Sequence, residues 1–88
     1  MTSKTLIVTN KVGFHARPAS LLIDCAKKFD CQITLSRGAD STNLKSIISL
    51  LKMNVKMGDE VTIAADGENE AQAVETLAGL IETNFGEE

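Results

Sequence analysis

The sequence predicts an α+β fold in which helices cover one face of an antiparallel β-sheet. Several short segments are rich in β-forming residues or alternate apolar with polar residues, as strands with one solvated face do. Longer segments between them carry apolar residues at helical spacing. With 88 residues, the chain is expected to form one domain, 1–88, with a thin core. The predicted order of elements is β-α-β-β-α-β-α, arranged in two layers.

The strands are predicted from composition and from alternation. Residues 4–9 are β-rich, residues 31–36 alternate cleanly, residues 41–44 add a short strand after a turn, and residues 60–67 alternate again. The side chains predicted to face the core are those of Cys31, Ile33, Leu35, Val61, Ile63 and Ala65.

Two longer helices are predicted from apolar residues that recur at helical spacing. The first runs from Ala16 to about residue 29, and the last runs from about residue 69 to residue 84. Gly79 lies inside the last helix, where glycine costs up to about 1 kcal/mol relative to alanine. We therefore expect close packing at Gly79.

A third, short helix is predicted over residues 46–53. This run is apolar nearly all round, so periodicity alone does not assign it. Ser46 is a good N-cap, and Leu50 and Leu51 lie one turn beyond Ile47. These features favour a helix, with Leu50 and Leu51 in the core.

Composition excludes several classes of protein. Hydrophobic residues make up 43% of the chain and charged residues 24%, which fits a folded chain rather than a disordered one. No apolar run approaches the roughly 20 residues that span a bilayer. The first residues also lack the apolar core of a signal peptide. A cytoplasmic protein without membrane insertion is expected.

Charge is distributed unevenly along the chain. Residues 1–56 hold all nine Lys and Arg residues and three acidic residues, a net charge of +6, whereas residues 57–88 hold nine acidic residues and no Lys or Arg, a net charge of −9. A solvated acidic helix accounts for the second part, and the positive first part suits an anionic substrate or an acidic partner. Without Trp or Tyr, a nucleic-acid partner is not expected.

Cys25 and Cys31 are the only cysteines, and their spacing matches neither a zinc site nor a C-x-x-C redox motif. Two reduced, partly buried thiols are expected, and neither a metal nor a cofactor is predicted. A metal or redox module built on this pair is a further alternative, which tight metal binding would support.

The stretch NKVGFHARPASLL, residues 10–22, holds the only histidine and the only proline of the chain. Gly13 permits a tight turn before a helix. Pro18 fits the first turn of that helix, where its missing N–H is not needed. His15 then falls at or near the helix N-cap.

A phosphate group fits beside this histidine. The first-turn N–H groups of Ala16 and Arg17, with the positive end of the helix dipole, form an anion site, and the Arg17 guanidinium adds further donors. A neutral imidazole nitrogen is a nucleophile, and a helix N-terminus favours the neutral form, so His15 can itself carry the phosphoryl group. A histidine near a helix start is also commonly a cap or a surface residue. From the residues alone both alternatives stay open.

The segment GFHARPAS, residues 13–20, resembles the active-site signature of the HPr family, the histidine-containing phosphocarriers of the phosphoenolpyruvate-dependent sugar phosphotransferase system (PTS). The resemblance extends to chain length, to the order of elements, to NLKSI at 43–47 and to GDEVTIAADG at 58–67. It implies an open-faced β-sandwich, in which a four-stranded antiparallel sheet carries three helices on one face. It also implies that the chain is a phosphoryl carrier and not itself an enzyme.

The resemblance also implies a role for each matching residue. His15 would accept phosphate from enzyme I and pass it to an enzyme IIA domain, and Arg17 would stabilise the phosphoryl group. Ser46 matches the serine that an ATP-dependent kinase modifies in many bacteria. A phosphate on Ser46 would add about −1.5 to −2 charges to the positive region around His15 and would repel an acidic partner.

The same resemblance places a partner interface on the short helix beside the histidine. A short helix cannot bury every side, so part of the run 46–53 should be an exposed apolar patch. The implied partners are enzyme I and enzyme IIA domains, with an HPr kinase/phosphorylase and a transcriptional regulator as further candidates, and a monomer is expected. The residues predicted to contact partners are Ser20, Leu21, Ile47, Ile48 and Leu51.

Two functional alternatives remain. The opening TNKVGFHARPA and the end NFGEE resemble nitrogen-related paralogues that serve a regulatory phosphorelay, whereas NLKSI and GDEVTI resemble the sugar carrier, which we favour. The run SIISLLKM departs from the S-I-M-G-V-M-S-L of many Gram-positive carriers. A purely regulatory binding module that acts through Ser46 is the second alternative, and the intact pair His15 and Arg17 argues against it.

Overall fold

The computed structural model describes residues 1–9, 11, 13–14 and 16–86. Over these residues four strands, three α-helices and one short 3-10 turn follow one another along the chain. They are β1 (Thr2–Ile7), α1 (Ala16–Ala26), β2 (Gln32–Arg37), β3 (Asp40–Asn43), α2 (Ile47–Met53), β4 (Glu60–Asp66), α3 (Glu70–Glu82) and η1 (Asn84–Gly86).

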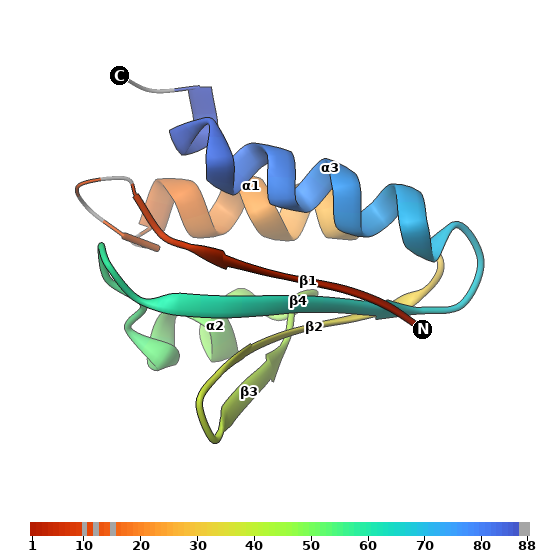
Figure 1. Ribbon diagram of the computed structural model, residues 1–88, viewed down its shortest axis with the longest axis horizontal. Coiled ribbons are helices and arrows are strands. Elements are labelled where there is room, and N and C mark those ends of the chain that lie inside the picture. Colours follow the sequence, from red (N-terminus) through yellow and green to blue (C-terminus); the bar gives the residue numbers. More distant parts are fainter. Residues whose placement is uncertain (10, 12, 15, 87–88) are drawn as a thin grey trace.

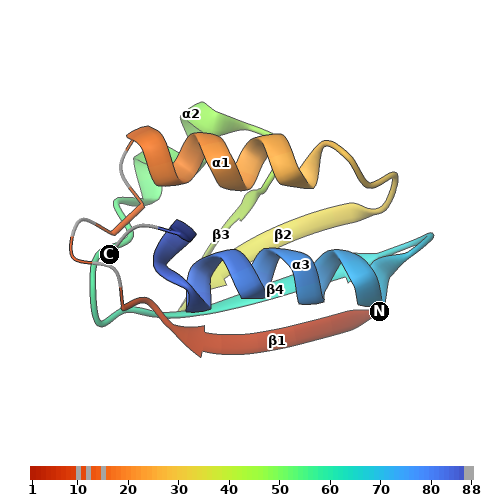
Figure 2. The same cartoon turned by 90° about the horizontal axis from the view of Figure 1, so that it is seen from above.

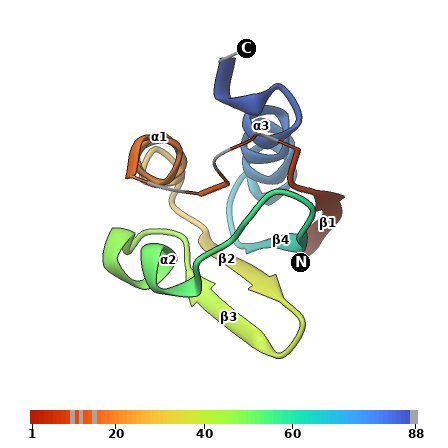
Figure 3. The same ribbon diagram turned by 90° about the vertical axis from the view of Figure 1, so that its left-hand side faces the viewer.

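The strands form one antiparallel sheet in the order β1-β4-β2-β3. Helices α1 and α3 lie side by side across the sheet (Figures 1 and 2). Helix α2 packs against both β3 and α1, and a view along the strands shows the three helices on one side of the twisted sheet (Figure 3). The predicted fold class, an open-faced β-sandwich with the order β-α-β-β-α-β-α, is confirmed.

The alternation predicted for β2 and β4 is present in the structure. All six side chains predicted to face the core are buried, and the residues between them lie on the open face or are half-buried. Strand β1 starts earlier than predicted, because its ladder with β4 runs from Thr2 opposite Ala65 to Ile7 opposite Glu60. Val8 leaves this ladder and instead exchanges hydrogen bonds with the turn at 58–59, donating its N–H to the Asp59 carbonyl at 2.9 Å.

The helices are shorter than predicted, and local hydrogen bonds explain their ends. Helix α1 ends at Ala26, and beyond it Lys28 and Phe29 donate i to i−3 bonds to the Cys25 and Ala26 carbonyls. Helix α3 starts after Asn69, which has a left-handed backbone with φ +60°. The last described element is the turn η1, in which Phe85 also has φ +60°.

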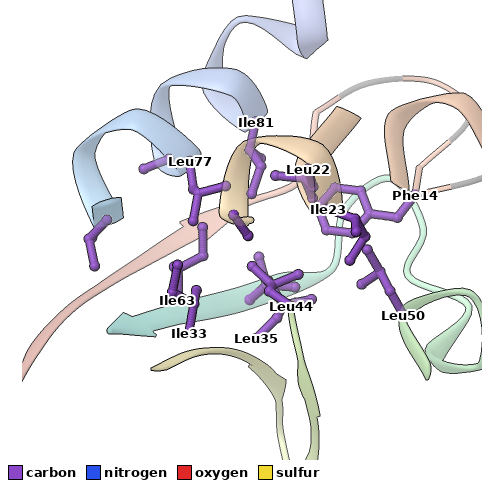
Figure 4. Packing of buried hydrophobic residues seen from close by; sticks show 14 of the residues in the cluster. Phe14, Leu22, Ile23, Ile33, Leu35, Leu44, Leu50, Ile63, Leu77 and Ile81 are labelled. Atoms are coloured by element: carbon purple, nitrogen blue, oxygen red, sulfur yellow. The ribbon is translucent and has the colours of Figure 1, made fainter. Parts of the chain in front are cut away.

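The core lies between the sheet and the helices (Figure 4). Leu22 and Ile23 from α1 and Leu77 and Ile81 from α3 point toward strand residues such as Ile63, and all five are at most 3% exposed. The other side chains of this layer that the figure labels are those of Phe14, Ile33, Leu35, Leu44 and Leu50.

Two predictions about packing are wrong. Leu50 is fully buried as expected, but Leu51 is 40% exposed, because α2 turns only one side toward the core. Close packing was expected at Gly79, yet a Cβ built there meets no atom within 4 Å. Gly79 instead lines a shallow groove between α1 and α3.

Candidate functional site

The segment before α1 is held against the loop that follows α2. Gly13 has φ +65°, and a Cβ placed on it would overlap the Val55 carbonyl oxygen and come within 2.9 Å of the Lys56 Cα. The Phe14 N–H donates to the same Val55 carbonyl at 3.0 Å. Gly13 therefore does more than permit a turn, because only a residue without a side chain allows these two backbones to approach so closely.

Phe14 anchors this segment in the core. Its side chain is 2% exposed and packs edge to face on Phe85, with ring centroids 5.7 Å apart and planes at 85°. His15 follows directly, and this predicted phosphoryl acceptor lies outside the described residues. Helix α1 begins at the next residue, Ala16.

The first turn of α1 matches the prediction at the described positions. Pro18 is the third residue of the helix and is buried, so it lies where its missing N–H leaves no intrahelical bond unmade. Ala16 and Arg17 lie in the same turn and are exposed to solvent. The N-terminus of a helix is the positive end of its dipole, so this end of α1 carries positive potential.

The loop under Gly13 is held by a carboxylate. Asp59 accepts the Lys56 N–H at 2.9 Å and the Arg37 Nη1 at 3.0 Å. The backbone bond from Lys56, opposed by partial desolvation and aided by Arg37, holds the pKa of Asp59 below its usual value. Arg37 also donates to the Asn54 carbonyl at 3.2 Å, so the turn that presents Val55 to Phe14 is tied to the sheet.

Ser46 is the N-cap of α2, as predicted. Its Oγ accepts the Ser49 N–H at 3.4 Å and lies 3.1 Å from the Ser49 Oγ. The neighbouring Lys45 donates from its ammonium to the Phe29 carbonyl at 2.6 Å, which links the start of α2 to the turn after α1. Ser46 itself is half-buried.

The residues predicted to contact partners lie on two helices that touch one another. Leu21 on α1 and Ile47 on α2 are 36% and 37% exposed, whereas Ile48 and Leu51 on α2 are 66% and 40% exposed. Ser20 on α1 is half-buried. We call Leu21, Ile47, Ile48 and Leu51 the apolar patch.

The two cysteines do not form a disulfide. Cys31 is buried and Cys25 is half-buried, and burial raises the pKa of the Cys25 thiol against a smaller opposing effect of Lys28. Separately, no helix among the described residues has the length and apolar character needed to cross a membrane.

Some features of this site are missed by sequence reasoning. Val55 and Phe85 carry no local signal of a functional role, since their contacts with residues 13–14 span more than 40 positions of the chain. The one usable signal is Gly13, which marks a place where backbone conformation is demanding. The role of Asp59 is not predicted from the sequence either, because Asp59 holds the turn in place and does not itself form part of the site.

Comparison with known proteins identifies the family. The family model for the PTS HPr component phosphorylation site matches residues 2–83. A phosphocarrier protein HPr from Mycoplasma capricolum is 44% identical over 77 residues, which cover 88% of this chain and 86% of that protein.

Solved structures agree with this result. The crystal structure of HPr-C-His from Thermoanaerobacter tengcongensis superposes with a TM-score of 0.96 at 40% identity, covering 100% of this chain and 99% of that one. The histidine-containing phosphocarrier protein of Mycoplasma superposes with a TM-score of 0.89 at 41% identity, covering 96% and 97% of the two chains. The chain therefore belongs to the HPr family, the phosphocarrier proteins of the phosphotransferase system.

Proposed function

We propose that this chain accepts a phosphoryl group on His15 from phosphorylated enzyme I and donates it to a histidine of a PTS enzyme IIA domain during sugar uptake. The observation that carries the proposal is the frame on both sides of position 15. Phe14 is held by the Val55 carbonyl and by Phe85, and α1 begins at Ala16. A reactive side chain benefits from such rigid neighbours, because transfer requires the nucleophile and phosphorus to align.

The transfer is an exchange of bonds at one phosphorus atom. A neutral imidazole nitrogen of His15 attacks the phosphorus held by enzyme I, the bond from phosphorus to its donor atom breaks, and a new N–P bond forms. In donation, a histidine nitrogen of the enzyme IIA domain attacks the same phosphorus, a new N–P bond forms there, and the N–P bond to His15 breaks. The chain is regenerated unchanged, as a carrier and not an enzyme.

Ala16 and Arg17 would stabilise the phosphoryl group. Both lie in the first turn of α1, whose backbone amides and dipole favour an anion. The Arg17 guanidinium offers planar donors to the phosphoryl oxygens, as arginine commonly does for phosphate. Each such interaction is modest, about 0.3–2 kcal/mol for the dipole, which suits a group that must be released again.

The apolar patch, with Ser20, would form the surface that receives both partners. Its members come from α1 and α2, the helices that begin directly after the two proposed phosphorylation positions. The residues between 1 and 56 carry a net charge of +6, so an acidic rim on enzyme I and on enzyme IIA would complement it. We expect the carrier to act as a monomer in the cytoplasm.

Phosphorylation of Ser46 by an HPr kinase/phosphorylase would regulate this docking. Ser46 caps α2 directly before Ile47 and Ile48 of the apolar patch. A phosphate there would add negative charge at the edge of the surface and repel an acidic partner, with no need to refold the helix. A transcriptional regulator that prefers the modified form could read the same change.

The experiment that tests this function is incubation with phosphoenolpyruvate and enzyme I, followed by intact-protein mass spectrometry. Wild type should gain one phosphoryl group that is lost in acid, as an N–P bond is, and His15→Ala should gain none. If wild type stays unmodified beside a donor that phosphorylates a known HPr, the carrier function is rejected. A regulatory module acting through Ser46 alone would then be the better account.

A further inference from the structure

We propose that the cleft between β3 and α2 binds a small polyhydroxylated monocarboxylate, the chemical class of the sugar acids. This cleft has a volume of about 500 Å³, which is the size of sites for small molecules. It lies away from the start of α1. Its lining residues are Arg37, Asp40, Ser41, Thr42, Asn43, Ser49, Lys52 and Met53.

The first argument is a buried hydroxyl that has no partner. Thr42 is 9% exposed, and its Oγ1 is the one buried side-chain N or O atom without a hydrogen bond among the described residues. Leaving such a group unsatisfied is unfavourable, and native proteins rarely do so without a water or a ligand to supply the bond. Since Thr42 forms part of the cleft wall, a polar ligand in the cleft would supply the missing hydrogen bond.

The second argument is the edge of the sheet. Leu44 donates its N–H to the Ile33 carbonyl at 2.9 Å, toward β2. Backbone groups alternate in direction along an antiparallel strand, so Thr42 also points toward β2 while Ser41 and Asn43 point their N–H and C=O outward. The Asn43 carbonyl is used by the Ser46 N–H at 3.1 Å. The remaining outward groups are too few for an added strand and suit a small polar ligand.

The third argument is charge. Lys52 is exposed in the last turn of α2, and Arg37 forms the opposite part of the lining. Arg37 bonds Asp59 and Asn54 through Nη1 and pairs with Asp40 at 3.6 Å through Nη2, which leaves donors of its guanidinium for a ligand. Because Asp59 and Asp40 both pair with Arg37, Lys52 is the positive charge that this lining offers to an anionic ligand.

This charge selects among ligands. Lys52 can pair with a single carboxylate, whereas a phosphate monoester, with about −1.5 to −2 charges, would meet stronger repulsion from Asp40 than a carboxylate does. Hydroxyls on the ligand match the hydroxyl and amide groups of Ser41, Asn43 and Ser49, and the Met53 side chain offers an apolar surface to carbon atoms. A polyol that carries one carboxylate offers a partner of the right chemistry to each of these groups.

The experiment is an amide NMR titration of the full chain with gluconate, with sorbitol and with acetate as matched probes. Gluconate should shift the amides of residues 37, 40–43, 49 and 52–53, and sorbitol and acetate should each bind about tenfold more weakly or worse. Equal binding of acetate and gluconate, shifts centred elsewhere, or no shifts at saturating gluconate would each overturn the proposal.

Two variants separate the contributions. Thr42→Val removes the hydroxyl at constant shape, so it should weaken gluconate binding about tenfold while leaving the thermal midpoint unchanged or raised. Thr34→Val, on the open face of β2, is its control and should leave gluconate binding unchanged. Lys52→Gln should weaken gluconate but not sorbitol. Thr42→Val and Lys52→Gln chains that bind gluconate like wild type would contradict the assignment.

Discussion

Phe14 and Phe85 pack edge to face at 5.7 Å, and this contact joins the residue before position 15 to the C-terminal turn η1. Phe85→Ala removes a ring that is 7% exposed and leaves a cavity against Phe14. We predict a loss of about 3 kcal/mol in the free energy of unfolding, measured by urea denaturation. Phe29→Ala, at a partly buried position beside the core, is the matched control and should lose less. Equal losses would mean that the Phe14–Phe85 contact contributes no more to the free energy of unfolding than the packing of Phe29 does.

Alanine substitutions at three glycines should change the stability of the protein in different ways. Gly13→Ala combines a positive φ with an overlap of the new Cβ and the Val55 carbonyl, and should destabilise the protein by about 2–4 kcal/mol. Gly38→Ala also has positive φ but open space around it, so about 1 kcal/mol is expected. Gly79→Ala, in α3 with nothing within 4 Å, should stabilise by about 0.5–1 kcal/mol. If the thermal midpoints of the three variants do not follow this order, the surroundings described for these glycines are wrong.

Substitutions at Ser46 separate its cap from its regulatory role. Ser46→Ala removes the acceptor for the Ser49 N–H and should cost about 1 kcal/mol of stability. Ser46→Asp keeps an acceptor but adds a negative charge, so stability should remain near that of wild type while enzyme I binds more weakly. Calorimetric titration should find this weakening larger at low salt than at high salt. A weakening independent of salt would indicate a steric cause instead.

Acid stability should depend on Glu70, at the start of α3. This carboxylate accepts hydrogen bonds from the Thr2 hydroxyl at 2.7 Å and the Gly67 N–H at 3.1 Å, and it pairs with the chain's amino group at 3.0 Å. The Thr2 bond, then the Gly67 bond, then the amino group lower the pKa of Glu70 from 4.5 to about 2. Because the folded-state pKa is the lower one, this stabilisation is complete above pH about 4.5 and is lost as the pH falls through about 2.

Glu70→Gln tests this link. The variant should melt below wild type at neutral pH, and the difference in thermal midpoint should shrink as the pH is lowered from about 5 toward 2. Glu75→Gln, on the exposed side of the same helix, controls for the change in net charge. A difference that stays constant or grows on acidification would contradict the assigned contacts.

Most of the fold follows from local patterns, whereas packing between distant segments does not. The alternation of β2 and β4 follows a two-residue period, and the apolar faces of α1 and α3 follow a 3.6-residue period. Both periods can be recognised in the sequence alone. The exposure of Leu51 and the open space at Gly79 depend instead on how the helices sit on the sheet. The start of β1 likewise depends on its register with β4.

In the candidate site, too, local features could be predicted from the sequence, whereas contacts between distant segments could not. Pro18 as a first-turn residue and Ser46 as an N-cap are confirmed, because capping and proline preferences are local. The roles of Val55 and Asp59 were not predictable, since each contributes through a turn brought to Phe14 or Arg37 by the tertiary fold. The function of His15 rests on the family and on chemistry, and stays a prediction.

The most direct test of the carrier role is a complete relay through position 15. The protein is phosphorylated by enzyme I, purified, and mixed in a rapid-quench apparatus with a sugar-branch or a nitrogen-branch enzyme IIA domain. We predict fast loss of the acid-labile phosphoryl group from wild type to the sugar-branch domain and slower transfer to the other. Arg17→Ala should slow both acceptance and donation. If the phosphoryl group is transferred to neither domain, or if it still forms on His15→Ala, the account is contradicted.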